Sequence, residues 1–83
     1  MVTTTIEAVL FAAAKPIKLK ELQKHLGLSQ EVVREALDAL AARRNTSDSG
    51  IHLIEANDAV QLVTNADLGE EVAKFLRVEA SGP

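Results

Sequence analysis

The four residues Leu26-Gly27-Leu28-Ser29 constrain the fold of this 83-residue chain more than any other feature of its sequence. Apolar residues recur with helical spacing on both sides of them, so they join two helices through a short turn. Glycine readily takes the left-handed conformation that ends a helix, and serine is a favoured N-cap of the next one. Connections of about three to four residues are typical of a helix-turn-helix. We therefore predict one helix over residues 19–26 and another from Ser29 to about Arg44.

A further helix is predicted near the start of the chain, over residues 5–14, with the threonines at positions 3–5 as possible N-caps. Pro16 ends it, because proline disfavours the helical conformation of the residue before it. Residues 16–18 are then expected to form a short extended piece. The apolar residues with helical spacing are Ile6, Val9, Leu10 and Ala13.

The second half of the chain predicts a β-hairpin followed by a helix. A polar, turn-rich loop over residues 45–50 precedes two strand-like runs, 51–56 and 59–64, which flank Asn57-Asp58. Asparagine and aspartate tolerate the positive φ that a two-residue hairpin turn requires. The last helix is expected over residues 66–78, with one apolar face made by Leu68, Val72, Phe75 and Leu76.

The order helix, short strand, helix, turn, helix, hairpin is that of a winged helix-turn-helix, a mainly α fold with a small β-hairpin. We assign residues 1–78 to this one domain and expect residues 79–83 to be a frayed tail or the start of a linker. A chain of 83 residues has no room for a second core. Winged helices bind DNA in some proteins and other proteins elsewhere, so the fold alone does not give the function.

Composition excludes several classes of function. The chain holds two aromatic residues, Phe11 and Phe75, too few for a platform on which single-stranded nucleic acid stacks. It holds no cysteine, and no apolar run approaches the roughly 20 residues that cross a bilayer. We expect a cytoplasmic protein without membrane contact, and the sequence predicts no metal site, no cofactor and no catalysis. His25 and His52 are the only histidines, and their spacing matches no catalytic or metal-binding motif.

If the chain binds DNA, the helix from Ser29 is the one that enters the major groove. Its exposed positions carry three acids, Glu31, Glu35 and Asp38, and the formal net charge of the chain is -3, whereas DNA-binding domains are usually basic. We therefore rank a DNA-binding transcriptional regulator as the alternative function. A solvated face for the lysines, and the favourable interaction of Arg43 and Arg44 with the C-terminus of their helix, explain the basic residues better than DNA contact does. The possible backbone contacts in that alternative are Lys18, Lys20, Lys24, Arg34, Arg43 and Arg44.

The first helix carries a second apolar face besides its core stripe. Ala8, Phe11 and Ala12 lie on this face, and Glu7 is the only charge between Ile6 and Ala14. A helix that is apolar nearly all round needs burial on two sides. We interpret the second face as a homodimer interface. The alternative is that the helix lies at the centre of the domain and packs internally on every side.

The chain resembles the amino-terminal winged-helix domain of the segregation and condensation protein B family. Its opening run over residues 6–17, I-E-A-V-L-F-A-A-A-K-P-I, and the later V-Q-L-V-T at 60–64 carry the likeness. The segments Leu19-Lys20-Glu21-Leu22, Leu26-Gly27-Leu28-Ser29 and Gly50-Ile51-His52-Leu53 add to it. Lys15, Lys18 and Val60 depart from the family pattern, which favours an acid, a capping serine and an aromatic there. The second winged helix of the family has no counterpart here.

The resemblance implies a non-catalytic accessory subunit of a chromosome condensation and segregation complex, built with an SMC ATPase. Such a subunit forms homodimers and binds a kleisin subunit, is nucleoid-associated in the cytoplasm, and touches DNA weakly or indirectly. Apolar residues outside the core stripes are the candidates for the kleisin contact, and packing beneath the last helix is their alternative. These candidates are Leu28, Val32, Ile54 and Val63.

Overall fold

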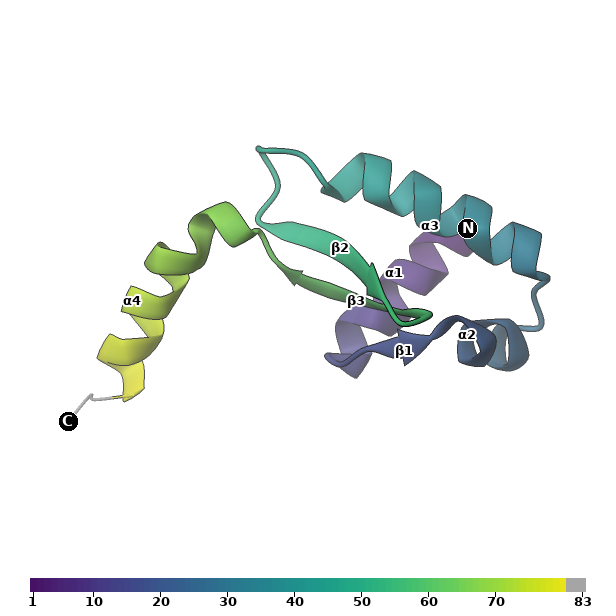
Figure 1. Ribbon diagram of the computed structural model, residues 1–83, viewed down its shortest axis with the longest axis horizontal. Helices are drawn as coiled ribbons and strands as arrows, with labels where there is room; N and C mark the ends of the chain where they lie inside the picture. Colours follow the sequence, from purple (N-terminus) through teal and green to yellow (C-terminus); the bar gives the residue numbers. More distant parts are fainter. Residues whose placement is uncertain (81–83) are drawn as a thin grey trace.

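The computed structural model describes the backbone of residues 1–80 and the side chains of residues 1–77. Figure 1 shows the predicted order of elements, and the winged helix-turn-helix is confirmed. This part of the chain is elongated, with extents of 48 × 25 × 24 Å. The elements are α1 (Val2–Ala13), β1 (Ile17–Lys18), α2 (Leu19–Leu26), α3 (Gln30–Arg44), β2 (Ile51–Ala56), β3 (Ala59–Thr64), the 3-10 helix η1 (Ala66–Leu68) and α4 (Gly69–Ala80).

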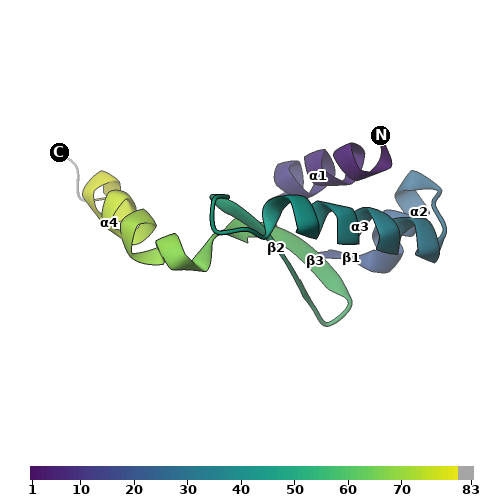
Figure 2. The same ribbon diagram turned by 90° about the horizontal axis from the view of Figure 1, so that it is seen from above.

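One hydrophobic core lies between α1, α2 and α3 and one face of a three-stranded antiparallel sheet of order β1-β3-β2. Strand alternation puts Leu53 opposite Leu62 on the core face, and Ile17 of β1 opposite Val60. Figure 2 shows the β2–β3 hairpin extending away from the helices as the wing. The buried apolar side chains are Ile6, Leu10, Leu22, Val33, Ala36, Leu37, Leu40, Leu53 and Val60.

The turn chemistry expected from the sequence is confirmed at both tight corners. Gly27 ends α2 with a φ of 65°, and the Ser29 hydroxyl accepts a hydrogen bond from the Val32 N–H at 3.2 Å. Asn57 and Asp58 have φ values of 54° and 62°, as a two-residue hairpin turn demands. The carbonyl of Asp58 also accepts the Leu19 N–H at 2.9 Å, so the wing tip satisfies a backbone donor in the first turn of α2.

Helix α1 differs from the expectation at both ends. It begins at Val2 rather than near residue 5, and no side chain caps it. Thr5 lies inside the helix, where its hydroxyl donates to the Met1 carbonyl at 2.9 Å instead of capping. The helix ends at Ala13, because Ala14 takes a left-handed φ of 54°. An alanine there is strained relative to glycine.

The last helix forms, but it does not cover the sheet. The predicted 66–78 segment begins as η1 and continues as α4 to Ala80, so the predicted tail is helical at positions 79 and 80, and its residues 81–83 lie outside the described residues. Figure 1 shows α4 standing away from the rest of the fold, and η1 is the element that it chiefly contacts. The alternative that Ile54 and Val63 pack beneath this helix is therefore wrong.

Two asparagines fix the wing at its base, and no pattern in the sequence indicated either of them. Asn45 follows α3, and its side-chain amide donates to the Leu53 carbonyl at 3.0 Å while its oxygen accepts the Leu53 N–H at 2.7 Å. Asn65 follows β3 and is 2% exposed. Its amide donates to the Ser49 carbonyl at 3.0 Å and its oxygen accepts the Asp67 N–H at 2.9 Å. The loop before the wing and the start of η1 are thus held together by one buried side chain.

Candidate functional site

The outer face of α1, formed by Thr4, Ala8, Phe11 and Ala12, is the candidate interaction surface. All four residues are exposed, and Phe11 is 72% exposed although it is one of the largest apolar side chains in the chain. Ile6 on the opposite side of the same helix is fully buried. The alternative that α1 packs internally on every side is therefore wrong, and its second apolar face is free in the single chain.

A hollow of about 360 Å³ lies beside Phe11. Its walls come from α1 on one side and from the first residues of β2 and the middle of β3, through Ile51 and Leu62, on the other. Glu7 and Arg44 complete its lining. A projecting aromatic ring and an apolar hollow thus lie next to each other on one surface.

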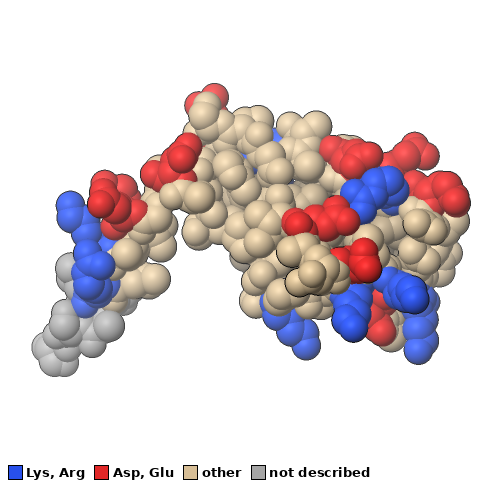
Figure 3. All heavy atoms as spheres, viewed as in Figure 1, with Lys and Arg blue, Asp and Glu red and all other residues tan. Residues whose placement is uncertain are grey.

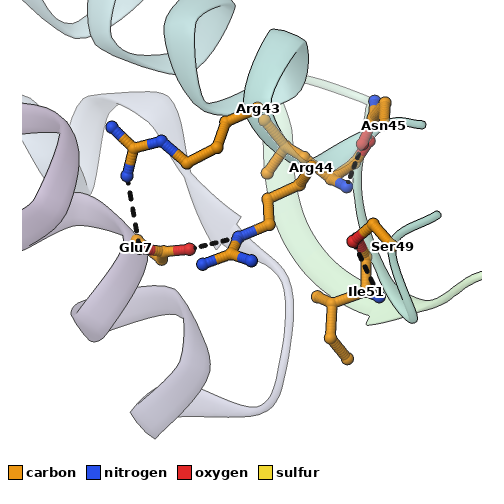
Figure 4. Close-up of polar contacts among 7 residues, drawn as sticks. Glu7, Arg43, Arg44, Asn45, Ser49 and Ile51 are labelled. Carbon is orange, nitrogen blue, oxygen red and sulfur yellow. Dashed lines mark hydrogen bonds and ion pairs between the residues drawn. The ribbon is translucent and has the colours of Figure 1, made fainter.

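Glu7 joins α1 to the end of α3. Figure 4 shows its carboxylate between the guanidinium groups of Arg43 and Arg44. The Arg44 Nε lies 2.5 Å from one carboxylate oxygen and the Arg43 Nη1 lies 3.7 Å from the other. The Glu7 side chain is only 19% exposed, so this contact is screened less than a surface ion pair. Both arginines, which were candidate DNA contacts, are paired with a carboxylate of their own chain.

Arg34 on α3, another candidate contact to the DNA backbone, is paired as well. Its guanidinium donates to both carboxylate oxygens of Glu55 on β2, at 3.0 and 2.8 Å, and lies 3.6 Å from Asp38. The hydrogen bonds with Arg34 lower the pKa of Glu55, and the same bonds raise the pKa of Arg34. This bidentate pair ties α3 to the wing across the exposed edge of the sheet.

The candidate lysines Lys18, Lys20 and Lys24 are all exposed and lie on β1 and α2. Figure 3 shows basic side chains along the lower edge of the body, over β1 and α2, and acidic side chains at the opposite edge, over α3. The helix that would read a DNA groove thus carries the exposed acids, and its arginines are paired with carboxylates of the same chain, whereas the exposed lysines lie on β1 and α2.

The four candidates for the kleisin contact do not form one surface. Ile54 and Val63 lie on the sheet face turned away from the core, because their strand neighbours Leu53 and Leu62 point inward. Leu28 is half-buried beside the start of α1, where it lines a small hollow, and Val32 is 37% exposed on α3.

The two histidines make separate local contacts. The His25 Nε2 lies 2.9 Å from Glu21 on α2, and the His52 Nε2 lies 2.8 Å from the Thr46 carbonyl. Among the described residues, no three His, Cys, Asp or Glu side chains gather into a group that would hold a metal ion. Over the same part of the chain, no helix combines the length and apolar character needed to cross a membrane.

The sequence model of the family described as "Segregation and condensation complex subunit ScpB" matches residues 4–82. The chain belongs to this family. Its similarity to the segregation and condensation protein B of Myxococcus xanthus is 37% identity over 78 residues, which is 94% of this chain and 24% of that protein. The corresponding protein of Caldanaerobacter subterraneus is 36% identical over 74 residues, 89% of this chain and 44% of that protein. The chain thus spans less than half of these ScpB relatives.

Two solved ScpB structures share the fold. One is described as the dimer of the ScpB N-terminal domain complexed with ScpA peptide; it matches with a TM-score of 0.81 and 23% identity, over 88% of this chain and 91% of that one. The other, ScpB from Mycobacterium tuberculosis, matches with a TM-score of 0.88 and 23% identity, over 99% of this chain and 51% of that one. At this identity the likeness establishes the winged-helix fold of the chain.

Proposed function

We propose that this chain is a non-catalytic, dimeric subunit of a chromosome segregation and condensation complex, and that it binds the kleisin subunit of an SMC complex. Membership of the ScpB family supports the role. The related N-terminal domain described as a dimer complexed with ScpA peptide supports both partners, a second copy and a kleisin. We propose a cytoplasmic, nucleoid-associated location, with DNA contacted weakly or through the partners.

The proposal of a dimer rests on the outer face of α1. An exposed aromatic ring costs solvation free energy, and burying it in a fitted hollow recovers that energy. Because Phe11 and its neighbouring hollow belong to the same surface, a two-fold axis lets each copy insert its ring into the hollow of the other. The small side chains of Ala8 and Ala12 allow the two α1 helices to approach closely.

The kleisin contact is proposed for the apolar surface of the body outside this dimer face. The candidates from the sequence remain Leu28, Val32, Ile54 and Val63, in the two separate patches described above. Ile54 is 48% exposed and Val32 is 37% exposed, so each has apolar area to bury against a partner.

The deciding experiment is sedimentation velocity of the wild-type chain over a range of concentrations, with Phe11→Glu beside it. An unpaired carboxylate in an apolar interface is strongly unfavourable, so we expect the dissociation constant of the dimer to rise by about 30-fold or more. Phe75→Glu is the matched control, because it makes the same aromatic-to-acid change on α4. An unchanged dimer in folded Phe11→Glu refutes the α1 interface.

The same sedimentation runs test the alternative of a DNA-binding regulator. We expect a dimer that ignores a labelled DNA duplex at moderate salt and co-sediments with a ScpA fragment. A monomer that binds the duplex with a steep salt dependence contradicts the proposal, because such a dependence reports phosphate neutralisation by basic side chains.

A further inference from the structure

A second apolar groove runs along a different side of α1, with α2 as its opposite wall. Its larger part has a volume of about 490 Å³, and Val9, Ile17, Leu22 and Leu26 line it. A smaller hollow of about 180 Å³ adjoins it, because Leu26 lines both. The remaining lining of the smaller hollow is Met1, Val2, Thr5 and Leu28.

This groove is lined by other residues than the hollow beside Phe11. With 3.6 residues per turn, Val2, Thr5 and Val9 lie along one edge of α1 and Phe11 lies on the opposite side of the helix axis, with Ala8 and Ala12 between them. The two hollows share no lining residue. A partner that covers Phe11 and its hollow therefore does not fill the groove itself.

The rim of the groove is mainly basic. Lys15 and Lys18 stand on it, and its one carboxylate, Glu21, lies 2.9 Å from His25. Lys20 and Lys24 add further positive charge to the exposed side of α2. Although the whole chain is acidic, this edge attracts negative charge (Figure 3).

We propose that this groove binds an acidic, amphipathic helical segment of the kleisin subunit. The apolar floor of these two adjoining hollows suits the apolar stripe of a helix, with anchors at i, i+3, i+4 and i+7. Carboxylates beside that stripe then meet Lys15 and Lys18 on the rim. The inference rests on the proposed function, and it places Leu28 at one end of the contact and leaves Ile54 and Val63 outside it.

The test uses fluorescent peptides of about 20 residues, tiled across the ScpA protein of the source organism, and measures their binding by anisotropy. We expect an acidic, amphipathic peptide to bind the wild-type chain, and the double change Lys15→Glu and Lys18→Glu to weaken it by about tenfold. Glu21→Lys makes the rim more basic, so it is expected to tighten binding about threefold. Both effects shrink with added salt.

The matched control is the double change Lys20→Glu and Lys24→Glu, which alters the net charge equally on the outward side of α2. It is expected to change affinity by less than about threefold, since these lysines do not line the groove. Equal losses in both double variants overturn the groove, because they show only a long-range charge effect. If Ile54→Glu lowers peptide affinity and the Lys15 and Lys18 variant does not, the groove is also overturned, and the contact lies on the sheet.

Two further outcomes separate this inference from the proposed function. If no ScpA peptide, nor intact ScpA, binds the wild-type chain, kleisin binding itself fails. If the Lys15 and Lys18 variant loses dimerisation in sedimentation while it keeps its peptide affinity, the groove holds a second copy of this chain. The acidic, apolar α4 is the segment of that copy with the matching chemistry, and this result overturns the kleisin assignment.

Discussion

The two phenylalanines of this chain are both exposed, yet the helices that carry them are held in different ways. Phe11 is 72% exposed on α1, whose opposite side buries Ile6 and Leu10 completely. Phe75 is 64% exposed on α4, in which no described side chain is buried. A ring on an anchored helix is already in position, so a partner does not have to order it. The comparison teaches that an exposed aromatic is the better candidate for an interface when its backbone is fixed by a core.

The largest expected effect comes from breaking the anchor of α1. Leu10→Ala removes a fully buried side chain and leaves a cavity, so we expect a loss of about 2–5 kcal/mol in the free energy of unfolding. Phe75→Ala on α4 is the comparison, and its expected change is below about 0.5 kcal/mol. Urea denaturation at fixed protein concentration measures both. Similar losses in the two variants would show that α4 is anchored as firmly as α1.

Next in size is the link between the body and the arm formed by η1 and α4. Asn65→Ala removes the buried partner of the part-buried Ser49 carbonyl and of the Asp67 N–H. We expect a loss of about 1–3 kcal/mol, because an unsatisfied buried polar group bears its full desolvation penalty. The control is Gln61→Ala on β3. Asn57→Ala would not serve, because Asn57 has a positive φ that alanine adopts only with strain. If Asn65→Ala and the wild type are equally stable in thermal unfolding, Asn65 does not link the body to η1 and α4.

A smaller gain is expected at the end of α1. Ala14→Gly relieves the left-handed strain at a φ of 54°, and the extra freedom of glycine in the unfolded chain offsets part of this. The net expectation is about 0.5–1 kcal/mol of added stability. Ala42→Gly, at an exposed position inside α3, should instead destabilise by roughly 1 kcal/mol. A loss at position 14 would mean that the side chain of Ala14 contributes packing there.

The smallest effect concerns the ion pair between α3 and the wing. The pKa of Glu55 is lowered from its ordinary 4.5 by its hydrogen bonds with Arg34, so the pair stabilises the fold fully above that value. Its contribution fades as the pH falls through the lower, folded pKa. The side chains are 43% and 39% exposed, which limits the effect to below about 1 kcal/mol. Comparing Glu55→Gln with wild type between neutral and acid pH should show a difference that disappears in acid.

Local chemistry explains why so much of the fold was predictable. Gly27 and Ser29 fix the turn between α2 and α3, and Asn57-Asp58 fixes the wing, each through the conformation or hydrogen bond of the residue itself. Helical spacing showed the second apolar face at Phe11 but left open whether a partner or the domain itself covers it.

What the sequence did not indicate depends on residues far apart in the chain. Glu7 meets Arg43 and Arg44 only after α1 has packed on α3, and no spacing rule links them. The paired hydrogen bonds of Asn45 look like ordinary loop polarity until β2 lies beside it. Likewise, the period of α4 shows that it has an apolar face, but not whether the rest of the fold covers that face.

The position of Asn65 also affects the orientation of α4. Helix α4 has 12 residues, and η1 carries it directly from the point that this side chain fixes. At 1.5 Å per residue the helix is about 18 Å long, so a swing of about 10° at its base displaces its far end by about 3 Å. A small rotation at Asn65 therefore becomes a larger displacement at the far end of α4. The hydrogen bonds of the Asn65 side-chain amide thus set the direction in which the chain leaves the winged helix.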